Sequence, residues 1–400
     1  MGRFLFAWEL GGDYGHLSRL LPIALGLRAR GHVVDFAVRE LLGAETLLTP
    51  HGFRALQAPA WLGRVTNLPE PASYAEMLMR FGFLNPQALT GVCRAWRHLV
   101  ELLRPDVLVM DHAPTALLAT RGMGLPRIHV GDGFCIPPGG RPMPGFRWWA
   151  TEQAARIADS ERHVLQAANA VLATLDAPPL VALEDLARCD DTLLCGFPEL
   201  DHYGERPHAL WIGAPHALGQ GAEPVWPAGE GPRVFAYLKS GYGGLEAVLT
   251  ALKASPARVL VHVPGASRRT AQVHAAPHLR FSDQPLDMRQ LAGTCDLAVC
   301  HGGAGTCTAM LLAGTPLLLL PMQLEQLMAA RRIAALGAAA VVPVEAVPQV
   351  ARLLRQALAD PGLRAAAGRF AAAHADHDPA QVAALAVSRC EGLLAPEVAA

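Results

Sequence analysis

The chain has 400 residues, of which 52% are hydrophobic and 17% are charged, so it is long enough for two globular domains with buried cores. A formal net charge of -1 gives no broad electrostatic surface for nucleic acid or for an anionic membrane, and we expect no nucleic-acid partner. The eight cysteines show no Cys-x-x-Cys pair and no Cys/His metal spacing, which predicts reduced thiols in a cytoplasmic protein.

The N-terminal apolar run is too short for a signal peptide and stops at two glycines. The longest apolar stretch, at residues 311–321, is interrupted by Gly314 and Pro316 and cannot span a bilayer. We therefore expect no transmembrane segment, while peripheral contact with a membrane stays compatible with the sequence.

Short apolar strands alternate with longer amphipathic helices, which is typical of parallel-sheet α/β domains. Strands are expected at residues 4–8, 33–38, 107–110, 127–130, 233–238, 259–263, 296–299 and 317–320. Helices are expected at residues 17–30, 115–120, 151–173, 307–313 and 327–336. Residues 201–232 are rich in Pro, Gly and His without clear periodicity, as in an interdomain linker.

These patterns predict two tandem doubly wound Rossmann-like domains, with ligands expected at the carboxyl ends of the strands. The predicted parts are an N-terminal domain at residues 1–205, a linker at 206–231, a second domain at 232–375 and a C-terminal helix at 376–400.

A glycine-rich loop follows the first strand and leads through His16 into a helical pattern. A histidine suits a general base because its unperturbed pKa lies near neutrality. The structural alternative is that His16 hydrogen-bonds the first helical turn. Asp13, in the same loop, is the reserve candidate for the base.

Asp111 ends the strand expected at residues 107–110, at the edge of the sheet where ligands bind. A carboxylate in this place could orient a base histidine and fix its tautomer. The equally weighted alternative is a cap for the helix expected at residues 115–120. Residues 131–134 form a further loop at a strand end that could line an acceptor site.

Residues 300–306 read Cys-His-Gly-Gly-Ala-Gly-Thr, between an apolar strand and a helix. Such a turn leaves several backbone N–H groups unpaired at the positive end of the helix dipole, which favours an anion. The turn therefore predicts a phosphate site made of Gly302, Gly303, Ala304, Gly305 and Thr306, with His301 as an added side-chain donor. The alternative is a tight turn that needs its glycines for shape alone.

Together with the strand and helix that follow, the run HGGAGTCTAMLLAGTPLLLLPMQLEQLMAARRIAALGAA resembles the donor-binding signature of the UDP-glycosyltransferase superfamily. These are enzymes of the glycosyltransferase-B (GT-B) fold that move a sugar from a nucleotide diphosphate. The loop at residues 11–19 resembles the Gly-His loop of the same superfamily. The resemblance implies that the domain at residues 1–205 binds the acceptor and that the domain at 232–375 binds the nucleotide-sugar donor across a cleft. It also implies that the C-terminal helix at 376–400 crosses back to the first domain. His16 is then the base with Asp111 as its partner, in metal-independent chemistry without a cofactor.

The resemblance also assigns donor contacts by position. Lys239, Ser240 and Gly241 match the loop that contacts the diphosphate, although a lysine is unusual there and its alternative is a solvated surface side chain. Gln284 matches the place where relatives hold the nucleobase, and Glu325 with Gln326 matches the pair that hydrogen-bonds sugar hydroxyls.

Two departures from the family pattern stand out. Relatives commonly carry Pro where this chain has Arg19, and many carry a glutamate that binds the ribose hydroxyls where this chain has Ala309. The second departure leaves UDP-sugars and dTDP-sugars both open. Asp376 and Asp378 form the one Asp-x-Asp pattern, which we interpret as a loop or helix cap and not as a metal site.

The sequence thus predicts an inverting, metal-independent glycosyltransferase that moves a sugar from a UDP- or dTDP-sugar to a hydroxyl of a small-molecule or lipid acceptor. A nucleotide-sugar epimerase of the same fold and a non-catalytic nucleotide-sugar-binding protein are the alternatives. A nicotinamide-dependent dehydrogenase is disfavoured because no clean Gly-x-Gly-x-x-Gly with a downstream acid is present. For the aromatic side chains of the first domain, Trp61 and Phe134 among them, core packing is the preferred interpretation over acceptor binding.

Overall fold

The computed structural model describes residues 1–12, 14–151, 154–206, 208–215 and 221–394. Asp13 lies outside these described residues. The chain divides into two compact units, Met1–His216 with Asp378–Ala400, and Ala217–His377. No helix among the described residues is both long and apolar enough to cross a membrane.

The first unit is built on a parallel seven-stranded sheet in the order β3-β2-β1-β4-β5-β6-β7. Its strands are β1 Arg3–Trp8, β2 Val33–Val38, β3 Arg54–Gln57, β4 Val107–Asp111, β5 Arg127–Gly131, β6 Asp191–Cys195 and β7 Trp211–Gly213. The strand order reverses between β1 and β4, and in parallel sheets such a switch point is where loops diverge and leave room for a ligand.

Helices cover this sheet because βαβ crossovers bury both of its faces. They are α1 Gly15–Ala29, α2 Leu41–Leu47, α3 Tyr74–Leu78, α4 Pro86–Leu103, α5 Pro114–Ala119, α6 Ala154–Thr174 and α14 Pro379–Glu391, with 3₁₀ turns η1 Thr49–His51, η2 Met79–Phe81, η3 Leu183–Ala187 and η4 Pro198–Leu200. Phe4, Phe6 and Trp8 of β1 lie fully buried under α1.

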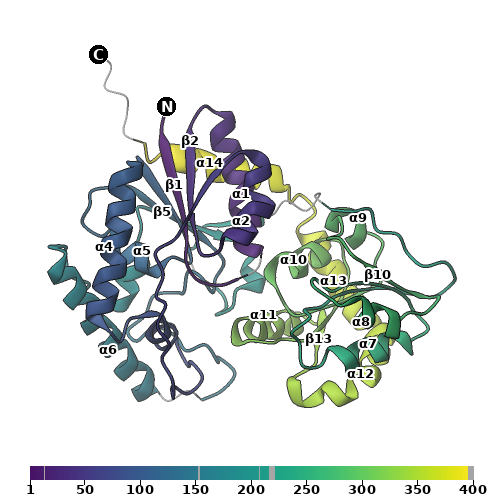
Figure 1. The fold of residues 1–400 in the computed structure, drawn as a ribbon. Helices are drawn as coiled ribbons and strands as arrows, with labels where there is room; N and C mark the ends of the chain where they lie inside the picture. Colours follow the sequence, from purple (N-terminus) through teal and green to yellow (C-terminus); the bar gives the residue numbers. More distant parts are fainter. Residues whose placement is uncertain (13, 152–153, 207, 216–220, 395–400) are drawn as a thin grey trace. The chain divides into compact units, whose positions relative to one another are not determined.

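The C-terminal helix α14 belongs to this first unit and lies beside α1, as Figure 1 shows in yellow against purple. Its Val387 is buried in the same core cluster as β1, and a Cβ on Gly26 of α1 would meet Val387 at 2.6 Å. Arg389 donates to Asp191 at 2.7 and 2.8 Å. Asp378 caps the helix by accepting the Ala380 N–H at 2.8 Å, which confirms the helix-cap interpretation of the Asp-x-Asp pattern.

The second unit carries a parallel six-stranded sheet in the order β10-β9-β8-β11-β12-β13, with its switch point between β8 and β11. The strands are β8 Arg233–Tyr237, β9 Arg258–His262, β10 Leu279–Ser282, β11 Leu297–Cys300, β12 Leu317–Leu319 and β13 Ala339–Val341. The helices are α7 Leu245–Lys253, α8 Arg268–Val273, α9 Met288–Ala292, α10 Ala304–Leu312, α11 Leu324–Ala335, α12 Val350–Ala359 and α13 Pro361–Ala373, with the 3₁₀ turn η5 Val344–Gln349.

The α/β fold class with two Rossmann-like sheets is confirmed, but one local prediction is wrong. Residues 206–231 were expected to be a linker, whereas β7 at Trp211–Gly213 is an edge strand of the first sheet. A strand of three residues among Pro, Gly and His has too few positions to show a period of two. In the second unit, α10 and α11 each begin three residues earlier than their apolar periodicity suggests.

Candidate functional site

The loop after β1 and the end of β4 bring His16 and Asp111 together. His16 lies in the first turn of α1, and its Nδ1 is 3.0 Å from Oδ1 of Asp111. The Asp111 side chain is fully buried and that of His16 is 12% exposed, while the His16 ring stacks on Trp8 with centroids 5.1 Å apart. A carboxylate accepts from Nδ1–H, so Nε2 is left as the basic nitrogen.

The capping interpretations of these two residues are wrong. The N-cap of α5 is Ala113 with no side-chain cap, so Asp111 does not cap that helix. The N-cap of α1 is Tyr14, also without a side-chain cap. The Nε2 edge of His16 lies against Gly11, whose φ is +91°, and a Cβ there would come within 2.2 Å of Nε2. Only a glycine fits this close approach.

Arg19, the departure from the family pattern, is buried beneath the pair. Its NH1 donates to both oxygens of Asp111 at 3.2 and 3.3 Å, and its NH2 donates to Oδ2 of Asp132 at 2.6 Å. Burial raises the pKa of Asp111, but Arg19 and His16 together lower it below its usual value. The same opposition of burial and Arg19 holds the pKa of Asp132 well below normal.

His112, next to Asp111, packs over the other side of His16 with ring centroids 5.9 Å apart. Burial lowers the pKa of His112 to about 3, with the neighbouring His16 adding to the effect, so this imidazole stays neutral. His16, His112 and Cys135 offer ligand atoms within 4.8 Å of one another, the arrangement a metal ion would use among the described residues. Burial, together with Asp132 and Asp111, raises the pKa of the Cys135 thiol well above normal, so this sulfur stays protonated near pH 7 and is a poor metal ligand.

In the second unit, the loop after β11 forms an open helix N-terminus. Gly302 has φ +95° and Gly303 is the N-cap of α10, without a side-chain cap. The N–H groups of Ala304, Gly305 and Thr306 therefore lack partners within the helix, and Gly303 is exposed. This is the geometry that binds phosphate oxygens.

The structure contradicts the donor role predicted for His301. Its Nδ1 lies 2.8 Å from the carbonyl oxygen of Leu320, and its Nε2 accepts the N–H of Lys239 at 3.0 Å. Because a carbonyl only accepts, Nδ1 carries the proton and Nε2 has none to donate. The buried His301 ring thus connects the loops after β8, β11 and β12.

Gln326 is likewise used inside the protein. It is 5% exposed, and its side-chain oxygen accepts the Met322 N–H at 2.9 Å. Contrary to the prediction, this oxygen is therefore not available to a sugar hydroxyl. Glu325 is half-buried and receives the Gln323 amide at 3.4 Å. Of the pair, Glu325 is the one more accessible to a ligand.

The remaining predicted donor residues lie on loops at the same sheet edge. Ser240 and Gly241 are exposed and Lys239 is half-buried, all directly after β8. Gln284 is exposed after β10, and its carbonyl accepts the Ser282 hydroxyl at 2.7 Å. The loop after β8 lies at the switch point of the second sheet, whereas β10 is an edge strand of that sheet.

A cavity of about 500 Å³ opens in the first unit beside the loop after β3. It is lined by Trp61, Gly63, Arg64, Val65, Thr66, Met79, Gly82, Leu84 and Asn85. The indole Nε1 of Trp61 is buried and has no hydrogen-bond partner among the described residues.

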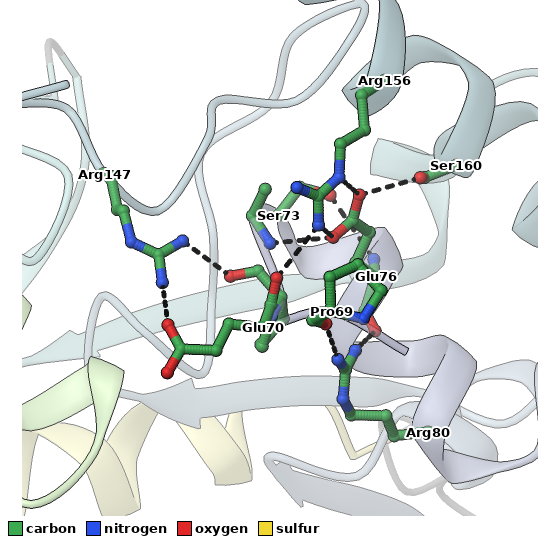
Figure 2. A network of polar contacts seen from close by, with 10 residues as sticks. Pro69, Glu70, Ser73, Glu76, Arg80, Arg147, Arg156 and Ser160 are labelled. Carbon is green, nitrogen blue, oxygen red and sulfur yellow. Dashed lines mark hydrogen bonds and ion pairs between the residues drawn. The ribbon is translucent and has the colours of Figure 1, made fainter. Parts of the chain in front are cut away.

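A polar network holds the segment that leads into this cavity, as Figure 2 shows. The buried carboxylate of Glu76 accepts from Arg156 at 2.7 and 2.6 Å, from Ser160 at 3.0 Å and from the Ala72 N–H at 2.9 Å. Burial raises the pKa of Glu76, but Arg156 and the other donors lower it below its usual value. Arg156 and Ser160 belong to α6, so α3 and η2 are fixed to that helix.

Three similarities to known proteins agree with this geometry. Residues 246–388 match the family described as "Erythromycin biosynthesis protein CIII-like, C-terminal domain". Zeaxanthin glucosyltransferase of Pantoea ananas is 26% identical over 359 residues, with 80% of each chain covered. The PGL/p-HBAD biosynthesis glycosyltransferase of Mycobacterium tuberculosis is 25% identical over 316 residues, covering 73% of this chain and 72% of the relative.

Among solved structures, spinosyn rhamnosyltransferase SpnG has a similar fold, with a TM-score of 0.70 and 20% identity over 97% of this chain and 100% of SpnG. SpnG has also been solved complexed with thymidine diphosphate and with the spinosyn aglycone. The two-sheet architecture with these likenesses defines a GT-B glycosyltransferase. Within that class, the chain is similar to UDP/dTDP-glycosyltransferases, and these likenesses support a glycosyltransferase with a nucleotide-sugar donor.

The sequence patterns missed Arg19 and Asp132 as partners of the pair. Asp132 follows β5 at the same sheet edge as Asp111, and the strand-end rule that selected Asp111 could have selected it too. Its Oδ1 accepts the N–H groups of Phe134 and Cys135 at 3.1 Å, which fixes the loop after β5. No comparable signal marks Arg19, because a charged residue within a helix usually faces solvent.

Proposed function

We propose that this glycosyltransferase inverts the anomeric centre in a single displacement, with His16 as the general base. The observation that carries the proposal is the 3.0 Å contact between His16 Nδ1 and the buried Asp111 carboxylate. Asp111 holds the ring in the tautomer whose Nε2 is free to accept a proton, as the carboxylate does in a hydrolase triad.

In this mechanism Nε2 of His16 takes the proton of the acceptor hydroxyl while the oxygen attacks the anomeric carbon. The bond from that carbon to the diphosphate breaks, and the nucleotide diphosphate leaves with the bonding electrons. The N–H groups of Ala304, Gly305 and Thr306 stabilise the charge that grows on it, as fixed dipoles do at other helix N-termini. These donors supply the stabilisation without a metal ion, which supports the metal-independent mechanism.

On the donor, the buried Ala309 favours a dTDP-sugar over a UDP-sugar. A methyl group accepts no hydrogen bond, so Ala309 cannot take the place of the glutamate that holds the ribose hydroxyls in many relatives, and a deoxyribose loses less by this change. The solved complex of SpnG with thymidine diphosphate points the same way. Glu325, at the start of α11, is proposed to accept from a sugar hydroxyl.

For the acceptor, the cavity beside Trp61 favours a small molecule over a lipid with long chains. Its volume of about 500 Å³ lies in the range of pockets that bind drug-sized ligands. The loop after β3 and the loop that carries His16 leave the same edge of one parallel sheet. Trp61→Ala is expected to raise the KM for acceptor and to leave donor binding unchanged.

The direct test uses His16→Ala, with His163→Ala as matched control because His163 is exposed on α6 and bonds only its own helix. Release of UDP or dTDP is measured from a panel of nucleotide sugars with phenolic, polyketide and terpenoid alcohols. His16→Ala should reduce turnover by about 10²–10⁴-fold, while thermal shifts by UDP-, dTDP- and GDP-sugars stay as in wild type. Retained turnover in His16→Ala would show that another group is the base.

The alternatives give different results in the same assays. An epimerase would form product from the donor alone, without any acceptor. A non-catalytic binding protein would show a thermal shift with a nucleotide sugar and no turnover with any alcohol in the panel.

A further inference from the structure

Arg19 is a buried charge one helical turn beyond His16. Residues three apart lie on the same face of a helix, so both side chains point to the ends of β4 and β5. The Arg19 guanidinium is 3% exposed and spans two carboxylates that come from different strand ends, those of Asp111 and Asp132.

A buried ion pair is seldom the cheapest way to fill a core. Hydrophobic residues of similar volume often stabilise a protein as much or more, so a buried Arg–Asp contact points to specificity or function more than to stability. In this site the arginine contacts the one carboxylate that also contacts the base. Oδ1 of Asp111 receives both Nδ1 of His16 at 3.0 Å and NH1 of Arg19 at 3.2 Å.

We infer that Arg19 is a positioning residue of the His16–Asp111 pair: it fixes the Asp111 carboxylate against Nδ1 and sets how strongly that carboxylate favours the protonated imidazole. The inference rests on the proposed function only in taking His16 as the base. It explains why this chain carries an arginine where relatives commonly have a proline.

The charges give the inference its direction. With both carboxylates ionised, Arg19, Asp111 and Asp132 carry +1, -1 and -1, a net charge of -1 beside His16. Arg19 opposes protonation of the imidazole, and Asp132, which interacts electrostatically with His16, favours it. Removing the charge of Arg19 and removing that of Asp132 should therefore shift this balance in opposite directions.

Burial keeps most of the other groups packed around the pair neutral near pH 7. The described titratable groups that interact with His16, Asp111, Arg19 or Asp132 are His112, His129, Cys135, Cys195 and His202. Burial lowers the pKa of His112 to about 3 and that of His129 to about 4, and it raises the pKa of Cys195 to about 12, so these three stay neutral near pH 7. The pKa of Cys135 is raised well above normal by burial and by the two carboxylates.

The closing experiment compares Asp132→Asn with the charge-balanced double variant Arg19→Met/Asp132→Asn. In Asp132→Asn the net charge beside His16 becomes 0, so the ring should protonate about one pH unit lower than in wild type. In the double variant Asp111 stands alone with His16, so the ring should protonate about one unit higher than in Asp132→Asn. Arg54→Met is the matched control, because Arg54 makes a comparable double contact with Asp35 at 2.8 and 2.7 Å on β2 and β3.

Protonation of the His16 ring is followed by NMR of the ligand-free protein, with His16→Ala to assign its signal, and the acid limb of the kcat–pH profile is measured in parallel. The pH midpoint of His16 protonation should be lowest in Asp132→Asn and highest in the double variant. Arg54→Met should have the midpoint of wild type. Arg19→Lys should keep only part of the effect of Arg19 on the midpoint of His16 protonation, because an ammonium cannot bridge both carboxylates as the guanidinium fork does.

Equal protonation midpoints in Asp132→Asn and the double variant would overturn the inference. If the double variant does not fold, Arg19→Lys decides in its place, because it keeps the charge of Arg19 but cannot bridge both carboxylates, and a wild-type midpoint with a wild-type kcat–pH profile there would overturn the inference. The NMR arm needs neither donor nor acceptor. A shifted midpoint with unchanged kcat–pH profiles would therefore refute His16 as base and leave the role of Arg19 standing.

Discussion

Replacing Gly11 by alanine should disable the base without removing any polar group of the site. Gly11 has φ +91°, and its Cβ would lie 2.2 Å from Nε2 of His16, 3.0 Å from Cδ2 and 3.2 Å from Cε1. An ordinary contact needs about 3.4 Å or more, so the imidazole must move by on the order of 1 Å. A misplacement of this size costs on the order of 10²-fold in rate.

The same displacement strains the contact with Asp111, and a ring that loses this partner also loses its fixed tautomer, which raises the expected loss to as much as about 10⁴-fold. The positive φ adds about 1 kcal/mol of folding cost for alanine relative to glycine. Gly12→Ala is the control, because nothing lies within 4 Å of a Cβ at Gly12 and the residue is exposed.

The assay is kcat for nucleotide release with a donor and acceptor that wild type turns over, together with the free energy of unfolding and the thermal shift by the donor. Gly11→Ala should lose at least 10²-fold in kcat with unchanged donor binding, and Gly12→Ala should stay near wild type. Turnover in Gly11→Ala within a few-fold of Gly12→Ala would refute the argument that the seat of the His16 ring against Gly11 governs the base.

Three further outcomes follow from the same kind of geometry. Gly302→Ala should weaken nucleotide binding by about tenfold or more, because φ is +95° and its Cβ would lie 3.0 Å from a backbone oxygen of α11. Gly303→Ala is the control, because nothing lies within 4 Å of its Cβ and it should fold as wild type. Calorimetric titration with UDP and dTDP measures nucleotide binding by both variants. Gly26→Ala should lower the free energy of unfolding, because its Cβ meets α14 at 2.6 Å. Gly91→Ala in α4, with nothing within 4 Å of its Cβ, should raise that free energy by up to about 1 kcal/mol, as measured by urea unfolding. A change of the same sign in both variants would contradict the tight α1–α14 contact. Burial holds the pKa of His112 at about 3, against 6.5 for an ordinary histidine, so the unfolded chain binds the extra proton and stability falls as the pH drops from about 6.5 toward 3. The loss is about 2 kcal/mol between pH 7 and 5, and His112→Gln should flatten that slope of stability against pH.

The alternation of short apolar strands with helices was enough to predict two Rossmann-like sheets, because parallel strands buried on both faces are nearly continuous apolar runs. It was not enough for β7, whose three residues at a sheet edge carry too little pattern. Boundaries such as the start of α10 at Ala304 escaped for a related reason. The first turn of a helix that faces a ligand holds glycine and polar residues, not the apolar ones that mark the interior.

The strand-end rule found His16 and Asp111, since parallel strands present their following residues at one edge. The strand-end rule does not predict which hydrogen-bond partners a side chain has. His301 has polar chemistry suited to a phosphate, yet its nitrogens are occupied by Leu320 and Lys239, which are 19 and 62 residues away in the chain. Whether a polar side chain serves the fold or a ligand depends on such distant contacts, which a local pattern does not contain.

The return of α14 to the first unit has a consequence for how the chain is made. Val382, Ala386, Val387 and Cys390 complete a core whose other members lie before residue 213. During synthesis the N-terminal sheet therefore leaves the ribosome with an apolar face of α1 still uncovered, and it stays so until all of Ala217–His377 has been translated. The second unit is thus an insertion within the first, and it has its full sequence available for folding before the first unit can close.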